Sequence, residues 1–553
     1  MKDAVRIKRL DSAEAATWML SFAAALAAVL IALSILPQGV HLPRPHWLLH
    51  PDETGYLITA KHFAETGSFV IEDEWYAQSP THVPPGAVEA DGRLVPKKAV
   101  GGYVVFAGAF LVSDEAWLYV GPLFGILAAL AVGMLVRQRT DDVLATAAAV
   151  VIVGTSSPFI AYGTGLAFGD LIALACFLWS CVFLYYHLGH PSEPMGMATA
   201  VLGSFAVLTR VDFAVPVALM VLAALVHFWR AGILREGLLT SAPGILLFIT
   251  AAGAMLFAND TFYGSPLSTG YQGGWQESPE GVAGSFTHIS VSGLLQLSGA
   301  YLLRIGLPCT MLLIAGLLLK GLLDTTSSRP IAALDFVFLG SIVFGLVYFL
   351  GRPGAYGTGE IWLVSSYPRY ILPVYAIGVV WGLHGICLLL RSSNVSRQIA
   401  IAALACVTAI AVAISLREAF LNGRGVSYIE TLSEKHRQYA EVVEDLKGPL
   451  VVVSDLNGKA LLNTRTITPH FSEIGTLETI NEVQALLEAG TRVIVFGDQR
   501  DHPTYSGYVE DLQTAGIQLR QSSCHLEVYE AFAPGVPLPD GTDLCQKTLE
   551  VSP

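Results

Sequence analysis

Two adjacent carboxylates, Asp52 and Glu53, are the first candidates for chemistry in this sequence. They stand between Pro51 and Tyr56, shortly after the first long apolar segment. A carboxylate in such a place can accept a proton, and two together can hold a divalent cation. The alternative for Asp52 is a structural one, as an N-cap that accepts backbone N–H bonds at the start of a helix. The sequence leaves both interpretations open.

Basic side chains form the complementary set of candidates. Lys97 and Lys98 are adjacent, Arg210 and Asp212 interrupt apolar sequence, and Arg369 lies just before another apolar run. Charges within a membrane or at its rim are costly and are functional candidates by default. Each also has a simpler interpretation. The lysines can contact anionic headgroups, Arg210 and Asp212 can pair with each other, and Arg369 can extend to the interface from a helix end.

The elements that position these residues are predicted to be membrane helices. The chain has 553 residues, of which 53% are hydrophobic and 14% charged, and its mean hydropathy is +0.55. Soluble proteins carry roughly a quarter charged residues. By length and hydropathy we expect a polytopic α-helical membrane protein with about eleven transmembrane helices. The predicted spans are 18–36, 117–136, 142–162, 170–188, 195–209, 213–229, 237–258, 301–319, 331–350, 370–390 and 398–416. The apolar segment 99–112 is short and glycine-rich, so we expect an interfacial or re-entrant helix there.

The distribution of Lys and Arg predicts the orientation of these spans. Cytoplasmic loops are enriched in both residues, and the N-terminus and most alternate loops carry them, with 189–194 as the exception. We therefore expect a protein of the plasma (inner) membrane whose N-terminus lies in the cytoplasm. The long loops 38–98, 163–169, 259–300 and 351–369 then share the extracytoplasmic side.

Within the first loop, 38–98, apolar residues after Asp52 recur at helical spacing up to Gly67. This pattern predicts a short amphipathic helix along the membrane surface. The candidate carboxylates and cations consequently gather on one membrane face.

The sequence changes character at about residue 417. We expect two domains, a transmembrane catalytic domain (1–416) and a small extracytoplasmic α/β domain (417–553). In the second, 449–455 and 491–498 read as buried strands and 479–489 as an amphipathic helix, which favours a parallel sheet. Cys524 and Cys545 would share an oxidising compartment and are candidates for a disulfide.

Several motifs, taken together in their order and sidedness, resemble the GT-C membrane glycosyltransferases over roughly residues 15–415. The nearest branch is that of the protein O-mannosyltransferases and lipid A aminoarabinose transferases. The motifs are Asp52-Glu53 with Tyr56 and Gly67, Gly92-Arg93-Leu94-Val95-Pro96-Lys97-Lys98 into Gly101-Gly102-Tyr103, Phe262-Tyr263-Gly264-Ser265-Pro266 to Gly270-Tyr271, and Pro368-Arg369-Tyr370-Ile371-Leu372-Pro373. Relatives commonly have prolines after the basic residue, whereas Ala99 and Val100 follow Lys98 here. Which lysine is equivalent therefore stays open.

The resemblance implies that a sugar moves from a polyprenyl-phosphate carrier to a hydroxyl of a lipid, an envelope glycan or a protein outside the cytoplasm. The attacking hydroxyl needs a carboxylate to take its proton, and the departing phosphate needs cations. Asp52 is the candidate base and Glu53 its support. The candidates for substrate binding are Lys97, Lys98, Arg210, Arg369, Tyr56 and Tyr370. Some relatives use a divalent metal, which Asp52 and Glu53 could hold; no cofactor is certain.

Two other classes of protein are considered. A lipid or sugar transporter or flippase also buries charges among many spans, but more often has broken helices and charges near the midplane. A non-catalytic scaffold needs neither the carboxylates nor the cations. The net charge of −13 gives no support to nucleic-acid binding.

The predicted orientation can be tested with a reporter that is active only in the cytoplasm, fused after Pro553. We expect this fusion to be silent, because the tail is predicted to be extracytoplasmic. A reporter inserted after Arg139, in a predicted cytoplasmic turn, is the matched positive control. Activity from the Pro553 fusion would overturn the assignment.

Overall fold

The computed structural model describes residues 51–72, 87–90, 93–163, 167–266, 268, 294–295, 298–299, 301–323, 329–350, 369–393, 395–420, 426–446, 450–454, 465–467, 473–496, 508–522 and 528–535. The predicted span 18–36, the predicted Cys524–Cys545 pair and the side chain of Asp52 lie outside this part of the chain.

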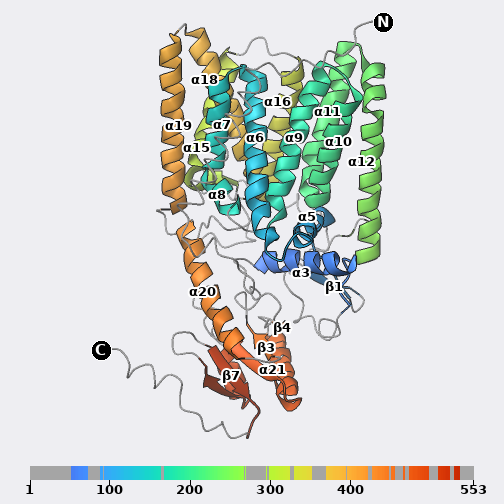
Figure 1. The fold of residues 1–553 in the computed structure, drawn as a ribbon, viewed down its shortest axis with the longest axis vertical. Coiled ribbons are helices and arrows are strands. Elements are labelled where there is room, and N and C mark those ends of the chain that lie inside the picture. The colour runs from blue at the N-terminus through green and yellow to red at the C-terminus, as the bar shows by residue number, and fades with distance from the viewer. Residues whose placement is uncertain are drawn as a thin grey trace, which may run out of the picture.

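Most described residues belong to a bundle of long helices that run side by side (Figure 1). Its members are α6 (Val120–Thr140), α7 (Val143–Gly154), α8 (Ser157–Gly163), α9 (Gly169–Gly189), α10 (Glu193–Thr209), α11 (Ala214–Ala231), α12 (Leu234–Tyr263), α15 (Leu307–Leu323), α16 (Arg329–Gly345), α18 (Leu372–Ser392) and α19 (Arg397–Phe420). Short 3₁₀ turns η2 (Ala116–Tyr119) and η3 (Val211–Phe213) and π turns η4 (Tyr301–Ile305) and η5 (Leu346–Leu350) extend some of them.

Within the described residues, seven helices are long and apolar enough to cross a membrane, or eight if one bent pair is one span. The protein is thus a polytopic α-helical membrane protein, but about eleven spans are not confirmed. Two of the predicted spans, 195–209 and 301–319, correspond to α10 and α15, which have 17 residues each.

The predicted span 142–162 is formed by two helices with a bend between them. Helices α7 and α8 meet at an angle of 61°. Pro158 lies in the first turn of α8, and a proline ring clashes with the carbonyl of the preceding turn and lacks an N–H donor. The helix therefore cannot continue straight through this position.

Helices α15 and α18 pack closely because glycines line their contact. A Cβ atom at Gly316 would lie 2.4 Å from the carbonyl carbon of Trp381, and one at Gly378 would lie 2.6 Å from the oxygen of Cys309. Membrane helices have little hydrophobic drive to associate, and close backbone approach compensates for it.

One helix, α3 (Pro51–Thr66), lies across the end of the bundle (Figure 1). Its bounds follow from the sequence. Pro51 suits a first helical turn, and Gly67 ends the helix at φ +75° while its N–H bonds to the oxygen of Phe63. The helix is confirmed, and its first half is covered by protein. The side chains of Glu53, Tyr56, Leu57 and Ala60 are buried, because α5 packs on this part of α3.

A hairpin of β1 (Ala87–Ala90) and β2 (Arg93–Pro96) follows, and α5 (Val100–Phe110) begins directly after it. Strand β2 is tied to the segment after α3, because Ile71 and Leu94 exchange backbone hydrogen bonds of 2.9 and 3.0 Å. The hydroxyl of Tyr263, at the end of α12, donates to the oxygen of Pro96. The hairpin thus fixes the position from which Lys97 and Lys98 emerge.

Helix α20 (Val426–Asp445) leads from α19 to a small domain on the same side of the bundle as α3 (Figure 1). The sheet has the order β4-β3-β5-β7-β6. Its strands are β3 (Leu450–Val453), β4 (Arg465–Ile467), β5 (Arg492–Phe496), β6 (Gln518–Gln521) and β7 (Val528–Phe532), with helices α21 (Glu473–Glu488) and α22 (Tyr508–Thr514). The predicted parallel pairing of β3 and β5 is confirmed. The sheet is mixed rather than parallel, because β7 pairs with β5 and β6 in the antiparallel sense.

The α15–α18 contact generates a stability prediction. Gly316→Ala should lower the free energy of unfolding by about 1–3 kcal/mol, because the new methyl group meets backbone rather than a flexible side chain. Gly321→Ala on the same helix is the matched control, since a Cβ there meets nothing within 4 Å. Thermal denaturation in detergent would measure both. Equal midpoints for the two variants would contradict the close contact.

Candidate functional site

The end of the bundle crossed by α3 gathers most of the residues singled out from the sequence. They come from α3, the turn between β2 and α5, the start of α9, the break between α10 and η3, and the residues before α18. The described side chains in this group are Glu53, Tyr56, Lys97, Lys98, Arg210, Asp212, Arg369 and Tyr370. Asp52 belongs to the same place through its backbone, in the first turn of α3 and one turn before Tyr56.

Tyr56 lies at the centre of this group. Its ring packs on Gly102, where a Cβ would come within 2.8 Å of the ring edge, and its hydroxyl lies 3.0 Å from the Cβ position of Gly169. The ring of Tyr103 lies 5.1 Å from it, centroid to centroid. Burial raises the pKa of the Tyr56 phenol well above its usual range, an effect opposed by Arg210 and reinforced by Asp170. The phenol therefore stays protonated and can donate a hydrogen bond.

Glu53 joins α3 to the segment before α9. Its side chain is fully buried, and its Oε1 accepts a 2.8 Å hydrogen bond from the backbone N–H of Ala167. A buried carboxylate is costly unless hydrogen-bonded. Because it fixes the first turn of α3, Glu53 also fixes the backbone of the neighbouring Asp52.

The two lysines occupy different surroundings. The Nζ of Lys98 lies 4.6 Å from the centroid of the Tyr56 ring, and its side chain is buried. Lys97 is half-buried. An ammonium over an aromatic face is attracted by the electrons of the ring, so Lys98 is the lysine drawn into the site.

Arg210 is held by two carboxylates. Its Nε and Nη2 each donate a 3.0 Å hydrogen bond to Asp212, and its Nη1 donates one of 2.7 Å to Asp170. The ion pair considered as an alternative from the sequence is therefore present. The guanidinium also lies 4.8 Å from the centroid of the Tyr370 ring, which connects it to the residues before α18.

Arg369 is buried rather than extended to the membrane surface, with 5% of its surface exposed. Its guanidinium lies 4.7 Å from the centroid of the Phe168 ring and 5.1 Å from that of Tyr370. Its Nη2 is 3.3 Å from the Tyr370 hydroxyl. Two arginines thus contact Tyr370: Arg210, at the end of α10, and Arg369, which precedes Tyr370 in the sequence.

Two contributors were not singled out from the sequence, Asp170 and Thr209. Both carry a buried oxygen, Oδ2 and Oγ1 respectively, without a hydrogen-bond partner in the described part of the chain. Both also lie by Tyr56, since Asp170 follows Gly169 and the Thr209 methyl is 3.1 Å from the Cβ position of that glycine. An acid at the start of the apolar run 170–188 was a detectable signal. Thr209 gave none, because threonine is ordinary in membrane helices.

The described charges of the site nearly balance. Glu53, Asp170 and Asp212 stand against Lys98, Arg210 and Arg369, and the half-buried Lys97 is a further cation. Within the same residues, no group of three or more His, Cys, Asp or Glu side chains could hold a metal ion. The site therefore offers cations and aromatic rings around a tyrosine hydroxyl, which suits an anionic, partly apolar ligand.

Several solved structures are similar to the whole chain. ArnT from Cupriavidus metallidurans in the apo state has a TM-score of 0.54 at 16% identity, covering 94% of this chain and 98% of its own. The oligosaccharyltransferase AglB from Archaeoglobus fulgidus, in complex with an inhibitory peptide and a dolichol-phosphate, has a TM-score of 0.50 at 12% identity, covering 94% and 75%. An Archaeoglobus fulgidus oligosaccharyltransferase with Zn and sulfate has a TM-score of 0.55 at 12% identity, covering 93% and 74%.

These neighbours are GT-C glycosyltransferases, and this chain has the GT-C fold. At sequence level, no protein-family model matches the chain. No curated protein sequence matches it either.

The pairing of Arg210 generates a prediction that separates a frame role from substrate binding. Arg210→Ala should destabilise the protein by roughly 3–5 kcal/mol, because it leaves the buried Asp170 and the partly buried Asp212 without their cation. Arg235→Ala, at an exposed position of α12, is the control and should stay within about 0.5 kcal/mol of the parent. Thermal denaturation in detergent would measure the change.

Asp170→Asn and Asp212→Asn added to Arg210→Ala should restore part of the loss, since they remove the unpaired charges. An Arg210→Ala protein as stable as the parent would contradict the frame role.

Proposed function

We propose that this multi-pass membrane protein transfers a sugar from a polyprenyl-phosphate carrier to a hydroxyl acceptor on the extracytoplasmic side of the membrane. The observation that carries the proposal is the convergence of Lys98, Arg210 and Arg369 with carboxylates at one end of a GT-C fold. The dolichol-phosphate bound to AglB supports a carrier of this class. The acceptor is a lipid, an envelope glycan or a protein.

In the proposed reaction, the acceptor oxygen forms a bond to the anomeric carbon while the bond from that carbon to the phosphate oxygen breaks. Asp52 takes the proton of the acceptor hydroxyl, and the electron pair of the broken bond leaves with the polyprenyl phosphate. A positioned carboxylate base contributes typically 10²–10⁴-fold to such a step. The proposal for Asp52 is supported by its place in the first turn of α3, next to the anchored Glu53.

The cations of the site are assigned two different roles, phosphate binding and structural support. Lys98 and Arg369, which lie over the rings of Tyr56 and Phe168, are assigned to the carrier phosphate and to the charge that develops on it. Arg210, bonded to Asp170 and Asp212, holds the frame between α9 and α10. Tyr370 lies under both arginines and Tyr56 under Lys98, so both tyrosines orient the cations. Glu53 positions α3.

The orientation and the domain division complete the proposal. We assign the N-terminus and the basic turns to the cytoplasm, in the plasma (inner) membrane, and residues 417–553 to the extracytoplasmic side with the site. The described structure is compatible with this division, because α3 and the C-terminal sheet lie at one end of the bundle and the α6–α7 turn at the other (Figure 1).

A transporter or flippase is the second candidate, because the bend between α7 and α8 is a feature that transporters often have. The residues at the bend are Thr155, Ser156 and Ser157, all buried and uncharged. Transport sites usually place charges at such a break. The charges of this protein lie instead around Tyr56, which favours transfer.

The assignment of the base and the cations predicts two different kinds of failure. Asp52→Asn should reduce transfer by roughly 10²–10⁴-fold and leave carrier binding intact. Lys98→Ala should weaken carrier binding by about 1.5–3 kcal/mol, whereas Lys97→Ala, the adjacent control, should change it less because Lys97 is less enclosed. Transfer would be followed with labelled polyprenyl-phosphate sugars and a membrane extract, and binding by competition with unlabelled carrier.

The proposed role of Asp52 would have to be abandoned if a folded Asp52→Asn protein transferred sugar at the parental rate. Equal binding losses for the two lysine variants would contradict the assignment of Lys98.

A further inference from the structure

The segment that carries Lys98 is short and irregular. Lys97, Lys98 and Ala99 connect β2 to α5 and belong to neither strand nor helix. Such a segment lacks the regular hydrogen bonds of secondary structure, so other groups have to fix its backbone. Lys98 nevertheless occupies a defined place, with its side chain buried and its ammonium 4.6 Å from the centroid of the Tyr56 ring. Contacts from outside the segment therefore direct Lys98 into the site.

Tyr103, on α5, holds the backbone at Lys98. Its hydroxyl oxygen accepts a 3.3 Å hydrogen bond from the backbone N–H of Lys98. The Tyr103 ring is fully buried and packs 5.1 Å from the Tyr56 ring, centroid to centroid. One pair of packed rings thus contacts Lys98 twice, because Tyr103 binds its backbone and Tyr56 lies under its ammonium.

Tyr263 holds the backbone at the other end of the segment. Its hydroxyl donates to the carbonyl oxygen of Pro96, which is 167 positions away in the sequence. Proline has no N–H, so this carbonyl is the single backbone group through which Pro96 can be hydrogen-bonded. Two tyrosine hydroxyls therefore hold the two peptide groups on either side of Lys97. One of them ties the end of α12 to the lysine segment.

The end of α12 has a local structure that places Tyr263. Tyr263 is the last residue of the helix, and Gly264 follows in the left-handed conformation at φ +71°. This conformation favours glycine, because a Cβ would be strained there. The side chain of Asn259 donates a 3.2 Å hydrogen bond to the oxygen of Pro266, which holds the chain after the turn. The motif Phe262–Pro266 thus forms a turn that supports the Tyr263 contact.

We propose that Tyr263 and Tyr103 are positioning residues that direct Lys98, through its backbone, toward the phosphate of the carrier. This inference rests on the proposed function, in which Lys98 binds that phosphate. Without the Tyr263 hydroxyl, the carbonyl of Pro96 loses its donor and the lysine segment is held at one end instead of two. Lys98 then spends less time over the Tyr56 ring, and the carrier is bound less tightly.

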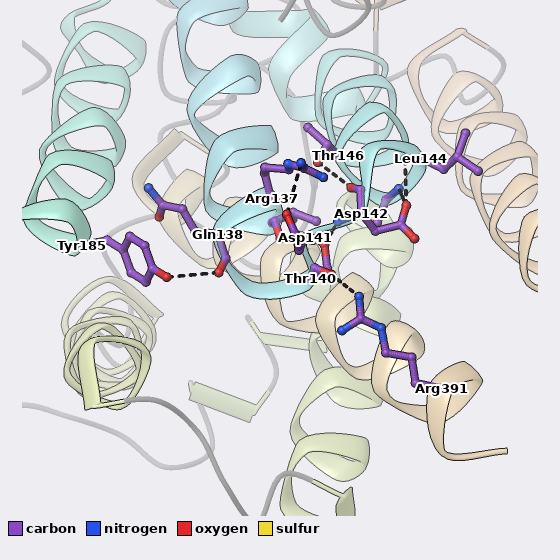
Figure 2. A network of polar contacts seen from close by, with 11 residues as sticks. Arg137, Gln138, Thr140, Asp141, Asp142, Leu144, Thr146, Tyr185 and Arg391 are labelled. Carbon is purple, nitrogen blue, oxygen red and sulfur yellow. Dashed lines mark hydrogen bonds and ion pairs between the residues drawn. The ribbon is translucent and has the colours of Figure 1, made fainter. Parts of the chain in front are cut away.

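The test uses Tyr263→Phe, which removes the hydroxyl and keeps the ring. Tyr185→Phe is the matched control, because its hydroxyl also donates to a backbone oxygen, that of Gln138 at 3.4 Å, but at the opposite end of the bundle (Figure 2). Binding of labelled polyprenyl phosphate is measured for each variant alone. It is also measured for Tyr263→Phe combined with Lys98→Ala and, separately, with Lys97→Ala.

We expect Tyr263→Phe to weaken binding of polyprenyl phosphate about two- to tenfold, as for the loss of one hydrogen bond. The same loss should appear in the Lys97→Ala background and vanish in the Lys98→Ala background, because the effect passes through Lys98. Tyr185→Phe should bind like the parent. An undiminished loss in the Lys98→Ala background would show a general structural effect and overturn the proposal.

A second measurement needs no carrier. Acetic anhydride modifies exposed lysine amines, and mass spectrometry reports the rate at each position. Lys98 should react slowly in the parent and in Tyr185→Phe because it is buried, and several-fold faster in Tyr263→Phe. Tyr103→Phe should give the same acceleration and replaces Tyr263→Phe if that variant does not fold.

The two measurements separate this inference from the proposed function. A parental rate of Lys98 modification in both Phe variants would overturn the positioning role, whatever the carrier does. Faster modification of Lys98, in a protein whose parent does not bind polyprenyl phosphate, would support the positioning role and contradict the proposed function.

Discussion

The arrangement of the site depends on the packing of the Tyr56 side chain against Gly102 and Gly169. Its ring needs the bare face of Gly102, and its hydroxyl reaches the backbone of α9 at Gly169. A side chain at either glycine would push α3 away from the bundle, because the nearest atoms belong to a buried aromatic ring. With α3 seated, Lys98 lies over the Tyr56 ring and Asp52 is carried on the same helix. One aromatic contact thus brings the proposed base and a proposed phosphate cation to the same place.

The second constraint is the cost of charge in a medium of low polarity. Glu53 lies beside a backbone N–H, Arg210 beside two carboxylates, and Lys98 and Arg369 beside aromatic rings, which reduces the cost of removing these charges from water. Arg210 is compensated by Asp170 and Asp212. The rings of Tyr56 and Phe168 lie beside the two other buried cations, Lys98 and Arg369. Such cations would suit the phosphate of the proposed lipid-linked donor.

Much of this could be predicted from the sequence, and the failures have physical causes. The helix from Pro51 to Gly67 could be predicted because proline favours a helix start and glycine a helix end. The charged candidate residues could be identified because charge is rare among apolar spans. The burial of α3 could not be predicted, since periodicity cannot distinguish a helix face that contacts lipid from one that contacts α5. Nor could the bond from Arg210 to Asp170, which joins residues 40 positions apart. The bend after α7 could have been predicted from Pro158. A hydropathy average over the whole segment does not register a single proline.

The central claim is that the charges around Tyr56 act on a sugar carried by a polyprenyl phosphate. The most direct measurement incubates purified protein with a polyprenyl-phosphate sugar, labelled in the sugar, together with a membrane extract and without any nucleotide sugar. We predict that label moves to an acceptor and that unlabelled polyprenyl phosphate is released in equal amount. Label that stays on the carrier, with the carrier merely crossing the bilayer in reconstituted vesicles, would contradict transfer and establish transport instead.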